Sequence, residues 1–122
     1  MSKVLRTTFL VHAILALVLG APLLLAPGRF LGLIGWEPVD PILSRVLGAA
    51  LLALAWSSYR GWRAANRAQV AFLLEAEAVF TALGAIGVLR HLVGANYPFM
   101  VWLLFAVLAL FAVAWSYLLA RE

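Results

Sequence analysis

Charged side chains are scarce in this sequence of 122 residues: only 11% are Asp, Glu, Lys or Arg, whereas 66% are hydrophobic. A soluble domain of this length is usually about a quarter charged and about half apolar. So few ionic groups do not cover a water-facing surface, whereas a lipid-facing surface needs none. We therefore predict an integral membrane protein.

Cysteine is absent altogether, which excludes disulfides, thiolate-bound metals and thiol nucleophiles. The HExxH, P-loop and GxSxG motifs are missing too. The two histidines, His12 and His91, are predicted near opposite membrane surfaces, so they do not ligate one haem. Ser57 and Ser58 have no base close to them in sequence. We predict no metal, no cofactor and no catalytic residue, and nothing in the sequence supports an enzyme.

Four long apolar runs are present, with predicted spans at residues 4–26, 41–59, 68–90 and 98–119. A spanning helix needs about 20 residues. The first run is longer than a typical signal-peptide core, so we expect it to be retained as a span. Asp40 is the predicted N-cap of the second span, with Pro41 at its first helical position. The prediction is an all-α fold: one domain over residues 1–122, forming an integral membrane up-down four-helix bundle.

Residues 27–39 lie between the first two spans and are too short to cross a bilayer. Their apolar side chains predict a segment lying in the membrane interface. The glycines at 28, 32 and 35 argue against a regular helix there. Phe30 and Trp36 of this segment, together with Trp62, are the predicted interfacial lipid contacts.

The net charge of +4 does not indicate a nucleic-acid partner, because the basic residues sit at the ends of apolar runs. Lys and Arg concentrate on one predicted side of the membrane. That side carries Lys3, Arg6, Arg60, Arg63, Arg67 and Arg121; the other carries Arg29, Arg45 and Arg90. Positive residues favour the cytoplasm, so both termini are predicted to be cytoplasmic. We expect a multi-pass protein of the cell inner membrane whose partners include membrane lipids.

Small residues predict where helices approach each other, because close packing replaces the hydrophobic drive in lipid. The candidate positions are Ala13, Ala16 and Gly20, then residues 48–50 with Ala53, and finally Gly84 with Gly87. Alanine is common throughout this chain, so the alternative that these positions mark no contact stays open.

Ionisable groups inside the predicted spans are the strongest functional candidates, since each costs about 2.5–3.5 kcal/mol or more when isolated at mid-bilayer. They are Glu77, Glu75, His12 and Arg45, with Thr81 on the same face as Glu77. At about 1.5 Å per residue from position 68, Glu75 lies about 10 Å deep and Glu77 about 14 Å deep. His12 and Glu75 have similar predicted depths and pair if their faces meet. Arg45 is expected to reach outward or to meet Asp40.

The two glutamates cannot share a helix face, because positions 75 and 77 are about 200° apart. One carboxyl faces the bundle; the other then faces lipid or another protein. Lipid is the costly choice, so we predict a homo-oligomer or a partner membrane subunit. The alternative is that a protonated carboxyl, bonded to a backbone carbonyl or to Thr81, serves packing alone.

The four short helices, the outer loop ending in Asp40 and residues 44–52 (SRVLGAALL) resemble the DoxX-like group of small bacterial tetraspan proteins. The resemblance is architectural and covers most of the chain. It implies a bacterial or archaeal cytoplasmic membrane and an accessory role in a membrane complex. It supplies no catalytic residues.

These observations predict a non-catalytic oligomeric or accessory subunit of a membrane complex. One alternative is a small proton- or cation-coupled transporter or channel, with Glu77 as the ion site and His12 and Glu75 as a relay. A second alternative is a lipid-binding or lipid-modifying protein, based on the apolar segment around Phe30 and Trp36.

Overall fold

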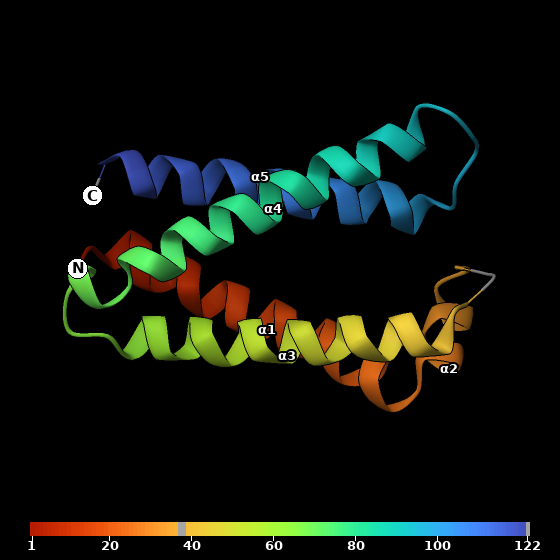
Figure 1. Cartoon of the computed structure of the whole chain (residues 1–122), viewed down its shortest axis with the longest axis horizontal. Coiled ribbons are helices and arrows are strands. Elements are labelled where there is room, and N and C mark those ends of the chain that lie inside the picture. The colour runs from red at the N-terminus through yellow and green to blue at the C-terminus, as the bar shows by residue number, and fades with distance from the viewer. Residues whose placement is uncertain (37–38, 122) are drawn as a thin grey trace. The chain divides into compact units, whose positions relative to one another are not determined.

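The computed structural model describes residues 1–36 and 39–121, and these form five α-helices and a 3-10 turn (Figure 1). Residues 37 and 38 of the predicted interfacial segment lie outside the described residues, as does Glu122. The elements are α1 (Lys3–Leu25), α2 (Pro27–Leu33), α3 (Pro41–Arg63), η1 (Arg67–Gln69), α4 (Ala71–Leu92) and α5 (Phe99–Arg121). The all-α prediction is confirmed for these residues.

Four of the helices, α1, α3, α4 and α5, are long and apolar enough to cross a membrane. Each has 22 or 23 residues, which gives a length of about 33–35 Å against a hydrocarbon core of about 30 Å. The prediction of four candidate spans is therefore confirmed. The up-down bundle, the single domain and the placement of both termini in the cytoplasm stay predictions.

Two span boundaries differ by three or four residues from those predicted, whereas the others differ by two residues or fewer. α3 continues past residue 59 to Arg63, because the basic residues 60 and 63 occupy its last turn, where cations favour the helix dipole. α4 begins at Ala71 rather than at residue 68, because residues 67–69 form the separate turn η1. Measured from Ala71, Glu75 is about 6 Å and Glu77 about 9 Å along the helix, so both lie closer to the helix start than predicted.

The starts of α1 and α3 are capped by side chains. One carboxylate oxygen of Asp40 accepts hydrogen bonds from the amides of Ile42 and Leu43, both at 3.0 Å. Pro41 occupies the first position of α3, where a missing amide hydrogen costs nothing. Ser2 caps α1 by accepting a bond from the Leu5 amide at 3.1 Å. The predicted cap at Asp40 is confirmed.

The prediction against a regular helix in the interfacial segment is wrong, because residues 27–33 form α2. Gly28 and Gly32 both lie inside this helix, and only Gly35 has a positive φ, at 74°. The amide of Trp36 donates to the Leu31 carbonyl and that of Gly35 to the Gly32 carbonyl. This is the Schellman arrangement, in which a glycine just past the helix adopts the left-handed conformation. Gly35 therefore ends the helix that the other two glycines permit.

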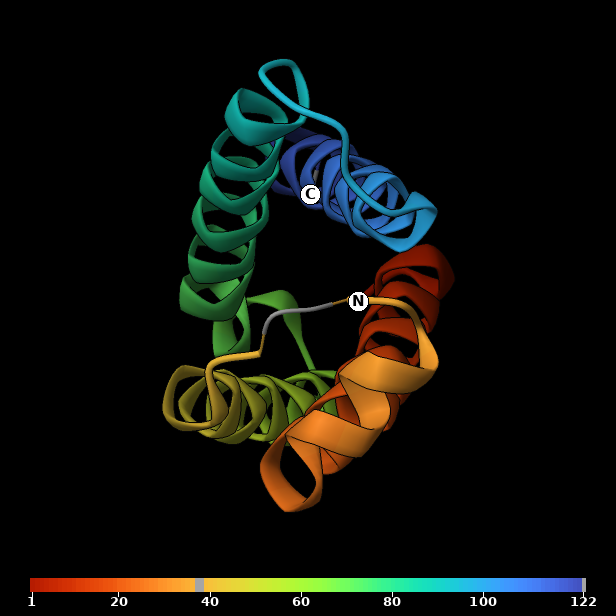
Figure 2. The same cartoon turned by 90° about the vertical axis from the view of Figure 1, so that its right-hand side faces the viewer.

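The chain divides into two compact units, residues 1–66 and residues 67–122. In unit 1, α1 and α3 pack against each other along their lengths and α2 lies against the end of α1, as Figures 1 and 2 show. In unit 2, α4 and α5 form a second packed pair. A short connection, residues 93–98, joins that pair.

The close approach predicted from small residues is confirmed at Gly20 and Gly48. A Cβ atom on Gly48 would lie 2.5 Å from the Leu24 amide nitrogen and 2.8 Å from the Gly20 carbonyl oxygen. Both distances are to backbone, so no side chain can move aside. On α4 the approach is ordinary: a Cβ on Gly84 would lie 3.5 Å from Leu108, and one on Gly87 would meet nothing within 4 Å.

Candidate functional site

The polar pair His12 and Ser58 lies inside unit 1, on helices that are predicted spans. The His12 Nδ1 atom is 2.8 Å from the Ser58 hydroxyl oxygen. Ser58 is completely buried and His12 is 6% exposed. A buried polar group in hydrocarbon needs a hydrogen-bond partner, and here a partner comes from the facing helix.

Sequence reasoning missed Ser58 as a site residue, because its hydrogen-bond partner His12 is 46 positions away in the chain. The antiparallel register supplies the missing signal. The two helices run in opposite directions, and Gly20 of α1 lies against Gly48 of α3. Closer to the start of α1 and the end of α3, Phe9 lies against Gly61. His12 and Ser58 fall between these two contacts. A helix-pair alignment based on the two glycines would therefore have found the pair.

Glu77 and Thr81 are both buried on α4, each with 1% exposure. The Thr81 hydroxyl donates to the backbone carbonyl of Glu77 at 2.6 Å and approaches that of Ala78 at 3.4 Å. Thr81 therefore donates to its own helix, and not to the carboxylate that shares its face. The placement of both residues on one inward face agrees with the sequence analysis.

Glu75 lies on the opposite, exposed face of α4. Its neighbours on that face are apolar, with exposures of 79% for Phe72, 59% for Val79 and 65% for Leu83. The prediction that the two glutamates occupy different faces is confirmed, and Glu77 is the inward one. The pairing of His12 with Glu75 stays a prediction.

Arginines at three helix ends donate to carbonyls of a neighbouring helix. Arg45 donates to the Leu24 carbonyl at 2.6 Å, and Arg6 donates to the carbonyls of Trp62 at 3.4 Å and Ala64 at 3.1 Å. In unit 2, Arg67 donates to the Leu119 carbonyl at 2.9 Å. The last carbonyls of a helix lack intrahelical partners, and a guanidinium satisfies both their bonding and their partial charge. Arg45 therefore uses the end of α1 as its acceptor, whereas Asp40 is engaged in capping α3.

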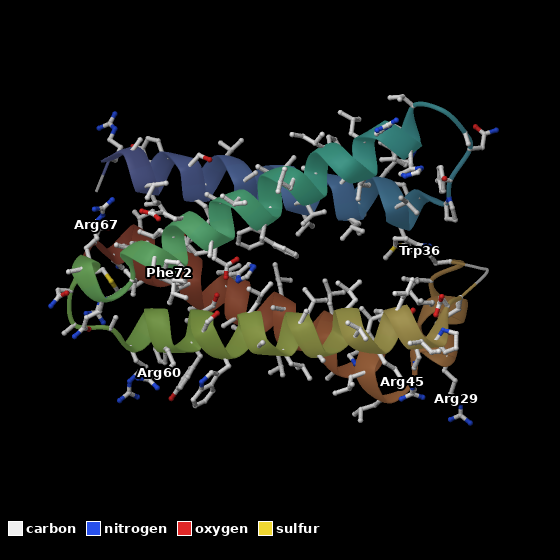
Figure 3. The ribbon with its side chains drawn as sticks, in the orientation of Figure 1. Arg29, Trp36, Arg45, Arg60, Arg67 and Phe72 are labelled. Carbon is white, nitrogen blue, oxygen red and sulfur yellow. The ribbon has the colours of Figure 1, made fainter. Side chains whose placement is uncertain are left out.

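The three predicted lipid contacts are all half-buried: Phe30 on α2, Trp36 just after α2, and Trp62 near the end of α3. Figure 3 labels Trp36 beside the end of α2. Trp62 belongs to a row of rings on α3. Its centroid is 5.9 Å from that of Tyr59, which is 5.7 Å from that of Trp56.

No group of three or more His, Asp or Glu side chains that could hold a metal ion occurs in residues 1–36 and 39–121. The four candidate spans indicate a multi-pass α-helical membrane protein. No family model, curated protein or solved structure matches the chain. The resemblance to the DoxX-like group therefore stays a prediction.

Proposed function

We propose that this chain is a non-catalytic membrane subunit that assembles with copies of itself or with another membrane protein through the outward face of α4. The observation that carries the proposal is Glu75, an exposed carboxyl among apolar side chains in a candidate span. The described residues give Glu75 no hydrogen bond or ion pair within its own unit. A partner surface would supply one and would remove the cost of a charge against lipid.

The rest of the chain agrees with such a role. Two of the three connections between the long helices are short, residues 64–70 and 93–98, so little of the described chain there is available to bind soluble ligands. The excess of Lys and Arg on one predicted side supports an up-down bundle in the inner membrane with cytoplasmic termini. The DoxX-like resemblance points to the same accessory role.

A competing explanation is that Glu75 reaches the membrane surface. It is about 6 Å from the start of α4, and helical side chains lean towards the helix N-terminus. The two explanations predict different effects of neutralising the Glu75 carboxyl on the mass of the purified particle. Assembly predicts that Glu75→Gln lowers the mass of the purified particle, whereas reach to the surface predicts no change in mass.

Blue-native electrophoresis and light scattering in a mild detergent measure that mass. After the mass of bound detergent is subtracted, we expect at least twice the 13.3 kDa of one chain, shifted towards the monomer by Glu75→Gln. Because the chain has no cysteine, any disulfide between two copies must come from a cysteine that is introduced by substitution. Val79→Cys should form disulfide-linked dimers if copies self-associate on this face, whereas Val18→Cys on α1, exposed to the same 59%, should not. A lone monomer in every detergent, for protein extracted from its native membrane, would refute the proposal.

A second candidate function, a proton or cation pathway, is favoured by the complete burial of the Glu77 carboxyl in a candidate span. Intramembrane acids are typical of proton relays. Flux into liposomes decides it: Glu77→Gln should abolish the flux, and Glu75→Gln, which removes a carboxylate of the proposed relay, should lower it. Flux that is unchanged by Glu77→Gln, or none above empty vesicles, would exclude this function.

A further inference from the structure

The last two turns of α3 carry two arginines and a row of aromatic rings on one exposed face. At 100° per residue, positions 56, 59, 60 and 63 fall within an arc of about 100°. Trp56 is 61% exposed and Tyr59 39% exposed, and both arginines are exposed. We call these residues the α3 patch: Trp56, Tyr59, Arg60 and Arg63.

The opposite side of the same turns is fixed against α1. A Cβ atom on Gly61 would lie 2.7 Å from the Phe9 ring, so only glycine lets the helix approach this closely. Gly61 is buried, and Phe9 is fully buried. This contact sets the rotation of α3, and the α3 patch consequently points away from α1. Figure 3 shows Arg60 extending away from the helix pair.

The end of a helix normally repels anions, because its free carbonyls carry partial negative charge. Here Arg6 of α1 donates to the carbonyls of Trp62 and Ala64, at the end of α3. This contact offsets the negative end of the helix. Within the described chain, Arg60 and Arg63 have no hydrogen bond or ion pair. The two guanidiniums are therefore available to an external anion, and the local charge is positive.

We propose that the α3 patch binds the headgroup of an anionic phospholipid. A guanidinium presents paired donors that match phosphate oxygens, and two of them lie one turn apart at the end of a candidate span. Trp and Tyr side chains concentrate at the depth of the headgroups. Exposed Ala49 and Ala53 continue the same face deeper along α3 and leave room for an acyl chain.

Native mass spectrometry of the full chain in detergent, titrated with phosphatidylglycerol, tests this. Phosphatidylcholine with the same acyl chains is the zwitterionic comparison. We expect tighter binding of phosphatidylglycerol, weakened about five-fold by Arg60→Gln or Arg63→Gln and about 25-fold by both. The matched control is Arg29→Gln with Arg90→Gln, two arginines that are also exposed and have no hydrogen bond in the described chain. This control should retain the affinity of the wild type.

Several results would overturn the proposal: equal affinity for the two lipids, no effect of the double substitution in the α3 patch, or an equal loss in the control. Inorganic phosphate is the probe for a site that needs no acyl chain. Binding of phosphate alone with the affinity of the lipid would assign a soluble anion instead and would refute the lipid. Circular dichroism checks that the exposed substitutions leave helix content unchanged. The proposal depends on unit 1 alone, so it can fail without affecting the assembly proposed for α4.

Discussion

The two units hold their helices together in different ways. In unit 1, α1 and α3 approach backbone to backbone at Gly20 and Gly48 and exchange polar contacts along the pair. In unit 2, Gly84 is at ordinary van der Waals distance from Leu108, and the Thr81 hydroxyl donates to its own helix. Arg67, which precedes α4, provides a polar bond to α5 at Leu119.

Lipid supplies no hydrophobic drive for one helix to bind another, so close packing and hydrogen bonds determine the register. Unit 1 has both, and its contacts extend from Arg6 near one end to Arg45 near the other. Sliding α1 by one turn would break every one of these contacts together. In unit 2, by contrast, a Cβ on Gly84 or Gly87 would meet no backbone atom of α5 within 4 Å. Backbone contact and interhelical hydrogen bonds together therefore fix the register of α1 against α3 in unit 1.

The largest difference between the units should come from adding one methyl group. Gly48→Ala places a carbon 2.5 Å from the backbone of α1, and overpacking of this kind costs about 1–3 kcal/mol. Gly87→Ala on α4 meets nothing within 4 Å and should cost nothing. Unfolding titrations with SDS in mixed micelles, followed by circular dichroism, measure the free energy of unfolding. Equal stability of the two variants would show that the glycine contact in unit 1 does not hold the helices.

Some features of the fold and of the candidate site could be predicted from the sequence, and others could not. Composition and run length were enough for the four candidate spans, and a 100° helical period was enough to separate Glu75 from Glu77. Local chemistry predicted the Asp40 cap. The glycines at 28, 32 and 35 led to the wrong prediction that no regular helix forms there. Glycine tolerates the helical conformation as well as the left-handed one, and of these three only Gly35, just past α2, adopts the left-handed one. The acceptor of Arg45 could not be predicted, because the Leu24 carbonyl becomes a neighbour only after the two helices have packed.

A smaller effect is expected for the buried polar pairs. Ser58→Ala removes a hydroxyl that bonds across two helices, and such bonds contribute about 0.6 kcal/mol on average in membranes, with a maximum of about 1.7 kcal/mol. Thr81→Val removes one that donates to its own helix, where such bonds add little. A double-mutant cycle of Ser58→Ala with His12→Phe isolates the coupling between the pair. Zero coupling would mean that the two side chains are neighbours without a stabilising bond.

A similarly small effect should come from the arginines at the helix ends. Arg6→Gln in unit 1 removes two bonds to the end of α3, whereas Arg67→Gln in unit 2 removes one bond to the end of α5. Charges at helix ends contribute about 0.3–1 kcal/mol each, so both variants should be mildly destabilised, Arg6→Gln more than Arg67→Gln. Raising the salt concentration should reduce both effects if charge dominates and leave them unchanged if hydrogen bonding dominates. The same SDS titration measures both losses of unfolding free energy. A greater loss for Arg67→Gln than for Arg6→Gln would contradict the difference between the units, because unit 2 would then depend more than unit 1 on a polar contact between its elements.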